Sequence, residues 1–283
     1  MKLSFMTLGC PKWDLDTICR HGQAAGFDAV DFRGYLDDID VTRLPAFTTA
    51  ADATRRTLED AGLAVSGISS SIALCDAAKR HDNLDEARRT IDTARGLHAP
   101  HVRVFGGGDV PTTGHDAAAA IGLDTMNEIL ALDGADQLKW VFETHDHWVR
   151  GADCARLLDG IPLPAFGALW DMGHTARVGG EAPDETFHHL RGRVYYTHVK
   201  DAVYNPDHPQ AMKDGWRYVP PGEGDLPLAQ SIALLAANGY DGYIVFEHEK
   251  RWHPDLPEPE QALPAFAQWA RQTLAQVADV KPG

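Results

Sequence analysis

Lys139-Trp-Val-Phe-Glu143 is one of four short apolar runs in this chain that each end in a residue able to bind a metal ion. The other three are Phe166-Gly-Ala-Leu-Trp-Asp171, Val194-Tyr-Tyr-Thr-His198 and Tyr243-Ile-Val-Phe-Glu247. The first three runs recur at nearly equal spacing, and a long loop precedes the fourth. In a parallel barrel, the carboxyl ends of the strands meet at one mouth. The pattern therefore predicts that Glu143, Asp171, His198 and Glu247 surround one ion.

The whole chain repeats one unit, which consists of an apolar run, a loop, a helical pattern and a turn that contains glycine. The apolar runs predict strands at residues 3–8, 29–33, 64–69, 101–105, 139–143, 166–171, 194–199 and 242–247. Helical patterns lie between them, at residues 15–25, 48–61, 84–97, 117–132, 153–158 and 227–237. The runs are continuously apolar, as expected of strands that are buried on both faces. Eight such units fill a (β/α)8 TIM barrel.

An open doubly wound sheet uses the same unit and is the alternative architecture. The barrel is favoured because eight strands fit and because no Gly-x-Gly-x-x-Gly motif opens the first helix. No low-complexity segment or linker divides the sequence, so residues 1–283 are predicted to form a single TIM-barrel domain. Two loops are longer than usual, at about 201–225 and 249–258, and long loops at the catalytic face shape substrate access.

Composition excludes several classes of protein. Apolar residues make up 44% of the chain, enough for a full core, but no run of about 18 apolar residues could span a membrane. The start of the chain has no signal-peptide pattern and the four cysteines show no CxxC spacing, so a cytoplasmic location is expected. The net charge of −15 argues against a nucleic-acid partner, because DNA binding draws on a basic surface.

The four ligand candidates form an oxygen-rich set of three carboxylates and one imidazole. Such a set suits Mn²⁺, Mg²⁺ or Co²⁺ better than Zn²⁺, which favours more histidine and cysteine. After a divalent ion is bound, open coordination positions could take two substrate oxygens. For each acid taken singly, the alternative is a structural carboxylate that caps a helix or pairs with an arginine.

Other polar residues follow the same strands and are candidates for substrate contact. His145 follows Glu143 closely, and His174 comes three residues after Asp171. Lys200 either orients a substrate hydroxyl or pairs with Asp201. Arg33 and Arg103, near the ends of strands two and four, could bind an anionic or hydroxyl-rich substrate, or form salt bridges in the mouth. Within the 201–225 loop, the segment Trp216-Arg217-Tyr218 offers a sugar a stacking surface and a cation.

The chain resembles the sugar-phosphate isomerase/epimerase group of xylose-isomerase-like TIM barrels, which includes ketose 3-epimerases and inosose dehydratases. The resemblance covers essentially the whole length. The motifs that carry it are Gly26-Phe-Asp-Ala-Val-Asp-Phe-Arg33, Glu143-Thr-His145, Asp171-Met-Gly-His174, His198-Val-Lys-Asp201, Pro221-Gly-Glu-Gly224 and Phe246-Glu247. The chain departs from many relatives on strand two, where Asp31 stands in place of the usual glutamate, and in the segment after Glu247.

The resemblance implies a function for each matching position. In ketose 3-epimerases of this kind, a Glu, Asp, His, Glu set binds a divalent ion, commonly Mn²⁺, and the two glutamates also move protons. Carried over, Glu143, Asp171, His198 and Glu247 are expected to bind one ion, with Mn²⁺ first and Mg²⁺ or Co²⁺ as alternatives. Glu143 and Glu247 become the acid/base pair, and His174 falls where such epimerases place a substrate-contacting histidine.

The leading hypothesis is therefore a metal-dependent isomerase or epimerase of carbohydrate metabolism that acts on a small polyhydroxylated carbonyl compound through an enediolate. The close rival is a lyase, because the same enolate can expel a β-hydroxyl from an inosose, a 3-keto-sugar or a 3-dehydroshikimate-like acid. A DNA-repair endonuclease with a trinuclear zinc site and a non-catalytic sugar-binding barrel are more distant alternatives. A non-phosphorylated small molecule is the expected partner, with no membrane and no nucleic acid, and a homo-oligomer stays open.

Overall fold

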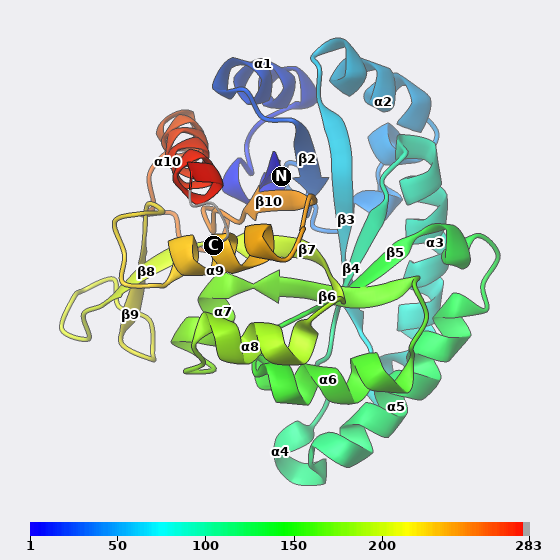
Figure 1. Ribbon diagram of the computed structural model, residues 1–283. Helices are drawn as coiled ribbons and strands as arrows, with labels where there is room; N and C mark the ends of the chain where they lie inside the picture. Colours follow the sequence, from blue (N-terminus) through cyan, green and yellow to red (C-terminus); the bar gives the residue numbers. More distant parts are fainter. Residues whose placement is uncertain (280–283) are drawn as a thin grey trace.

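Eight parallel strands close into a barrel in the computed structural model, which describes residues 1–279 (Figure 1). The barrel strands are β1 (Lys2–Met6), β2 (Ala29–Phe32), β3 (Ala64–Ala73), β4 (His101–Phe105), β5 (Lys139–Glu143), β6 (Phe166–Asp171), β7 (Val194–Val199) and β10 (Tyr243–Phe246). Neighbours along the chain pair side by side, and the pairing of β1 with β10 closes the ring. The predicted (β/α)8 barrel is confirmed.

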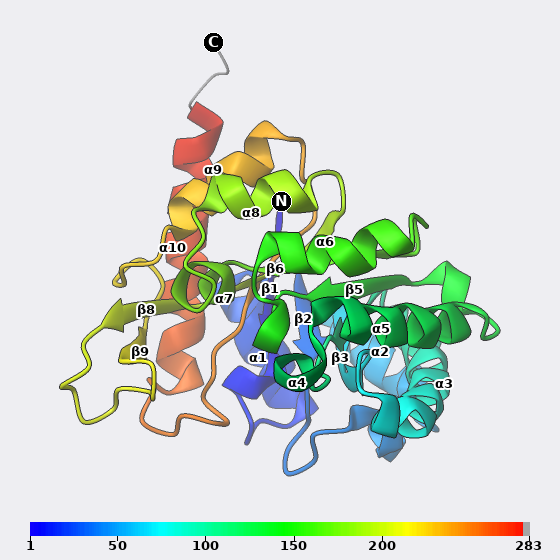
Figure 2. The same cartoon turned by 90° about the horizontal axis from the view of Figure 1, so that it is seen from below.

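Helices surround the barrel and connect its strands, as the two views in Figures 1 and 2 show. They are α1 (Leu15–Ala25), α2 (Ala51–Asp60), α3 (Arg80–Leu97), α4 (Val110–Thr113), α5 (His115–Leu130), α6 (Gly151–Gly160), α7 (Met172–Arg177), α8 (Pro183–Leu190), α9 (Leu228–Ala237) and α10 (Pro259–Asp279). Helix α1 shows why the predicted bounds hold. The Asp14 side chain accepts a hydrogen bond from the Thr17 N–H, and Gly26 ends the helix in the left-handed conformation.

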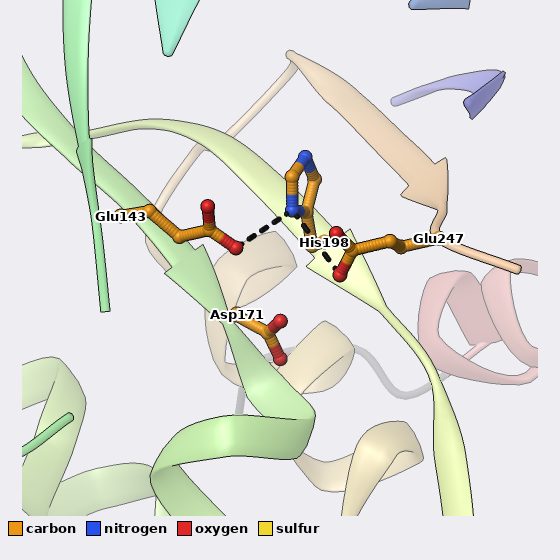
Figure 3. Close-up of side chains that lie close together, drawn as sticks. All are labelled: Glu143, Asp171, His198 and Glu247. Atoms are coloured by element: carbon orange, nitrogen blue, oxygen red, sulfur yellow. Dashed lines mark hydrogen bonds and ion pairs between the residues drawn. The ribbon is translucent and has the colours of Figure 1, made fainter. Parts of the chain in front are cut away.

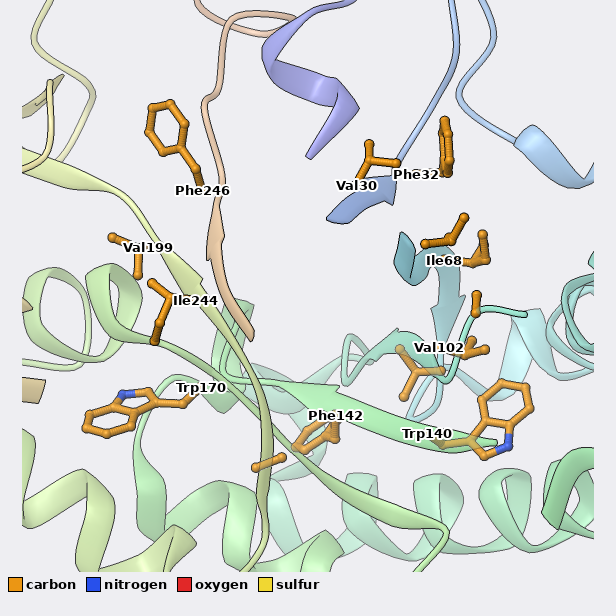
Figure 4. Close-up of a cluster of buried hydrophobic side chains, with 14 of the residues drawn as sticks. Val30, Phe32, Ile68, Val102, Trp140, Phe142, Trp170, Val199, Ile244 and Phe246 are labelled. Atoms are coloured by element: carbon orange, nitrogen blue, oxygen red, sulfur yellow. The ribbon is translucent and has the colours of Figure 1, made fainter. Parts of the chain in front are cut away.

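Alternate residues along each strand face opposite sides of the barrel wall. On β5, Trp140 and Phe142 belong to the large apolar cluster between the barrel and its helices, whereas Val141 belongs to the smaller cluster inside the barrel. Figure 4 shows Trp140, Phe142 and other members of the outer cluster. A side chain two residues beyond an inward-facing residue also faces inward. The strand therefore directs Glu143 into the barrel, in line with Val141.

Several elements differ from the sequence prediction. The predicted long loop at 201–225 contains two antiparallel strands, β8 (Asp201–Tyr204) and β9 (Trp216–Val219), which form a hairpin at the left of Figure 1. The predicted strand 3–8 ends at Met6, because the chain turns into a short 3₁₀ helix at Thr7–Gly9. Helix α10 follows a proline-rich stretch and has Pro264 inside it, which weakened its helical pattern in the sequence.

None of the helices in the described part of the chain has both the length and the apolar character needed to cross a membrane.

Candidate metal centre

Four side chains converge at the carboxyl ends of four neighbouring strands. Glu143, Asp171 and His198 come from β5, β6 and β7, and Glu247 follows β10 directly. One ligand atom from each lies within 4.8 Å of the others, and all four residues are buried. Figure 3 shows the side chains pointing toward one another. The structure thus brings together the complete set of metal-ligand candidates.

The inward direction of these residues follows from the alternation along their strands. Val141, Leu169, Tyr196 and Val245 form the apolar cluster inside the barrel together with Met6 and Leu8. Each of the first four lies two residues before one of the ligand candidates. The ligands therefore form the next layer above this apolar cluster, toward the mouth of the barrel.

Asp171 is held in place by both of its neighbouring loops. Its backbone N–H donates to Thr144 Oγ1 at 2.9 Å, and its Oδ1 accepts from the His174 N–H at 2.8 Å. The second bond caps the start of α7, so the sequence Asp171-Met-Gly-His174 ends a strand and begins a helix at one residue. In the strand register, Asp171 lies opposite His198. Asp171 Oδ2 stays available because Oδ1 makes the cap.

The His198 imidazole lies between the two glutamates. Its Nδ1 is 3.1 Å from Glu143 Oε1 and 3.5 Å from Glu247 Oε2. Burial by itself lowers the pKa of His198, but the charges of Glu247 and Glu143 raise it to about 10. Burial raises the pKa of Asp171 to about 7, against the opposing charge of Lys200. The excess negative charge of the cluster therefore favours protonation of His198. A bound divalent ion would supply positive charge in place of that proton.

Lys200 supplies a positive charge on the other side of the cluster. Its Nζ lies 2.9 Å from Asp171 Oδ2, 2.5 Å from Glu247 Oε2 and 3.0 Å from Glu249 Oε1. Of these three contacts, only the one to Glu249 has hydrogen-bond geometry. The alternative that Lys200 pairs with Asp201 is wrong. The Asp201 carboxylate instead accepts backbone N–H groups from its own turn and from the 222–226 segment, which fixes the base of the β8–β9 hairpin.

The donor set fits a divalent ion. Glu143 Oε2, Asp171 Oδ2 and Glu247 Oε2 are buried and accept no hydrogen bond within the described chain. Each lies within 4.0 Å of the cation of Lys200 or Arg103, but without a hydrogen bond its lost hydration is compensated only in part. Three carboxylates and one imidazole in this arrangement match the ligand preferences of Mn²⁺ and Mg²⁺. The four residues could therefore hold such an ion.

Predicted substrate-contacting residues gather in the mouth beside this cluster. His174 is buried, and its ring packs edge-on against His145 with the centroids 4.7 Å apart. The half-buried His145 ring also packs on Phe105 at 4.7 Å. The Arg103 guanidinium also packs on Phe105, with its central carbon 3.7 Å from the centre of the ring. Its Nη1 lies 3.5 Å from Glu143 Oε2. Arg33 follows the last residue of β2, at the same end of the barrel.

From the predicted Trp216-Arg217-Tyr218 segment, the hairpin places Tyr218 beside Lys200 and Glu247. Tyr218 lines a small pocket with Lys200, Glu247 and residues of the 246–262 segment, and Lys200 Nζ lies 5.9 Å from its ring centre. Trp216 packs on Tyr204 across the hairpin, and neither Trp216 nor Arg217 lines this pocket. Substrate contacts from Trp216 and Arg217 stay a prediction that requires the hairpin to move.

Glu249 gained its significance only from the structure. Its carboxylate reaches Lys200, although the only signal for Glu249 in the sequence is its position two residues beyond Glu247. Asp31 lies inside the barrel, where its carboxylate accepts hydrogen bonds from Ser69 Oγ at 2.8 Å and Tyr196 OH at 2.9 Å. Burial raises the pKa of Asp31.

Comparison with known proteins agrees with this architecture. A family model described as a xylose isomerase-like TIM barrel matches residues 19–273. Over 123 residues, the chain is 28% identical to the rhizopine catabolism protein MocC of Rhizobium meliloti. That alignment covers 40% of this chain and 35% of the length of the relative.

Solved structures match over nearly the whole length. The probable 3-DHS dehydratase AsbF of Bacillus anthracis has a TM-score of 0.75 at 16% identity, with 96% of this chain and 99% of that chain covered. The 3-keto-D-glucoside 4-epimerase YcjR of E. coli has a TM-score of 0.71 at 16% identity, with 99% of each chain covered. A xylose isomerase-like TIM barrel protein from Mycobacterium smegmatis in complex with magnesium has a TM-score of 0.72 at 17% identity, with 98% and 97% covered. At these identities the likeness shows a shared fold.

Proposed function

The chain belongs to the family of xylose isomerase-like TIM barrels, and we propose that it is a divalent-metal-dependent isomerase or epimerase of a small sugar-like carbonyl compound. One observation supports this reaction above others. Two glutamates, Glu143 and Glu247, approach the same imidazole from two sides, as Figure 3 shows, within one buried cluster of metal-ligand type. Inversion at a carbon next to a carbonyl uses such a pair, with a base on one face and an acid on the other.

In this proposal Glu143, Asp171, His198 and Glu247 hold the ion, with Mn²⁺ expected and Mg²⁺ or Co²⁺ as alternatives. The structure of the Mycobacterium smegmatis protein with magnesium supports a hard divalent ion in this fold. When bound, the ion supplies Lewis-acid stabilisation to negative charge that develops on a substrate oxygen. The buried carboxylate oxygens that accept no hydrogen bond within the described chain support the placement of an ion among these four residues.

The chain's own residues then carry the protons. One of Glu143 and Glu247 removes the proton from the carbon next to the carbonyl, and the other returns a proton to the opposite face. Both are buried, so water is excluded from the transfer and each carboxylate can be tuned as a base. His174 and His145 contact the substrate from the mouth, and Lys200 balances the negative charge of Glu247 through its ion pair. Each positioned acid or base contributes about 10²–10⁴ in rate.

The second candidate is a lyase that acts on an inosose, a 3-keto-sugar or a 3-dehydroshikimate-like acid. It shares the first proton removal and differs in the next step, in which an acid protonates a departing β-hydroxyl. His145 supports this candidate, because its half-buried ring lies in the mouth against His174, where a leaving hydroxyl would depart. The likeness in fold to a probable 3-DHS dehydratase supports it as well.

A single domain over residues 1–283 and a cytoplasmic location remain sequence predictions. A homo-oligomer stays open.

Solvent deuterium exchange tests the proposal. The protein, loaded with Mn²⁺ or Mg²⁺, is incubated in D₂O with separate ketoses, inososes and 3-keto-glycosides, and each substrate is followed by NMR. We expect metal-dependent exchange at the carbon next to the carbonyl, with an epimer or isomer as product. An unsaturated product would favour the lyase. The Asp171→Asn protein serves as the control, and exchange that survives chelation or this substitution would contradict the proposal.

A further inference from the structure

Two arginines, the buried Arg103 and the half-buried Arg33, flank strand β3 at the mouth of the barrel. Arg33 follows the last residue of β2, and Arg103 lies on β4. Ser69 of β3 links the two positions: it pairs with Arg103 in the strand register, and its carbonyl oxygen accepts a hydrogen bond from Arg33 Nη1 at 3.4 Å. The two guanidinium groups are close enough that the positive charge of Arg103, added to burial, lowers the pKa of Arg33 to about 10.

Arg103 has hydrogen-bonding capacity to spare. Its side chain is only 3% exposed, yet Nε and Nη1 have no hydrogen-bond partner within residues 1–279. The nearest carboxylate oxygen is Glu143 Oε2, at 3.5 Å from Nη1, which is too long for a strong charge-assisted bond. Packing of the guanidinium on the Phe105 ring fixes its plane. Since Glu143 is also a proposed metal ligand, it cannot serve Arg103 alone.

Arg33 lacks an acidic partner. Its Nη1 donates to Ser71 Oγ at 2.8 Å and to the Ser69 carbonyl, both of which are neutral. Within the described chain, no carboxylate oxygen lies within 4.0 Å of its guanidinium. Glu86 is nearby, but its Oε1 accepts a hydrogen bond from the Ser71 N–H at 2.6 Å. Arg33 therefore presents a positive charge to the mouth without a paired anion.

Two neighbouring cations repel each other, and neither has a carboxylate at hydrogen-bond distance from its guanidinium. An anionic ligand between them would relieve this repulsion. We propose that the substrate carries an anionic group, a carboxylate or a phosphate, that binds between Arg33 and Arg103. This inference rests on the proposed function, and it narrows the substrate to an anionic polyhydroxy carbonyl compound. The guanidinium of Arg103, stacked on Phe105, offers such a group N–H donors on Nε and Nη1 that have no hydrogen-bond partner within residues 1–279.

Binding of three sugars that differ at C6 tests the proposal. The probes are D-glucose, D-glucuronate and D-glucose 6-phosphate, and calorimetry or ligand-observed NMR measures their affinity for the Mg²⁺-loaded protein. We expect glucuronate or the phosphate to bind at least about tenfold more tightly than glucose. This factor corresponds to the free energy of one hydrogen bond to a charged group. The comparison of the two anions shows which group the site prefers. Equal binding of all three sugars, or no binding of either anion, would overturn the proposal.

Variants connect the preference to the arginines. Arg33→Met should remove most of the tenfold preference for the anion over glucose while metal binding persists, and Arg33→Lys should restore part of the preference. Arg56→Met, which removes an exposed arginine of α2, is the matched control and should keep the preference. A preference that survives Arg33→Met in a protein with an unchanged melting temperature refutes the site. Because binding is measured without turnover, a failure here is distinguishable from a failure of the exchange experiment.

Discussion

Lys200→Met should have opposite effects on the stability of the metal-free protein and on its affinity for metal. The Lys200 ammonium lies 2.9 Å from Asp171 Oδ2 and 2.5 Å from Glu247 Oε2. Methionine keeps much of the length of the side chain but removes its charge. Two buried carboxylates then lose their counter-ion, and breaking a buried ion pair from one side costs about 3–5 kcal/mol. The metal-free protein should therefore unfold more readily.

Metal binding should become tighter in the same variant. Since oxygen ligands lie about 2.1 Å from Mg²⁺ or Mn²⁺, an ion bound by Asp171 or Glu247 is no more than about 5 Å from Lys200 Nζ. At an effective dielectric constant of about 20, the repulsion between this ammonium and a divalent ion is about 6–7 kcal/mol before relaxation. Relaxation of the site and the nearby Glu249 carboxylate reduce this repulsion. We expect at least about a tenfold gain in affinity, which corresponds to about 1.4 kcal/mol.

Competition with a fluorescent Mn²⁺ chelator measures the affinity, and chemical denaturation in EDTA measures the stability. Lys139→Met, at the opposite end of strand β5, is the matched control and should change neither metal affinity nor its pH dependence. Substitution of a residue that only hydrogen-bonds to a metal ligand typically lowers metal affinity by about 10–100-fold. Asp171→Asn should lower it by more than this, because Asp171 is a proposed ligand. If Lys200→Met also weakens metal binding, Lys200 orients the ligands instead of competing with the ion, and the electrostatic reasoning is wrong.

Three further predictions concern turnover, pH and the hairpin. Glu143→Gln and Glu247→Gln should keep appreciable metal binding and lose at least about 10²-fold in turnover each; near-normal turnover with metal bound would exclude the two-glutamate mechanism. Metal affinity should rise at least about tenfold per pH unit between pH 6 and 8, because the ion must displace a proton from His198, whose pKa is raised to about 10. Below pH 7 it must also displace one from Asp171, whose pKa is raised to about 7. A flat profile in chelator competition would contradict this. Protease cleavage within residues 201–225 should slow when a true substrate or inhibitor binds, and unchanged digestion patterns would count against a covering role for the hairpin.

The barrel could be predicted because its strands are continuous apolar runs with sharp ends. Strands β4, β5, β6 and β7 begin and end at the predicted residues. Their limits were readable because a polar residue or a glycine-containing turn interrupts each apolar run. The β8–β9 hairpin was read as a loop, because its strands are only four residues long and half-buried and therefore lack an apolar pattern.

The sequence by itself determined which residues are the candidate ligands, because Glu143, Asp171, His198 and Glu247 lie at or next to the ends of strands, and parallel strands end at a common mouth. It could not show which face of each strand points into the barrel, since strands buried on both faces are apolar on both. Only the closed barrel decided which charges meet. Lys200 reaches Glu249 across 49 positions of sequence, and Arg33 approaches Arg103 across β3. Such contacts depend on strand register and on the direction of side chains from distant segments, which no local pattern in the chain contains.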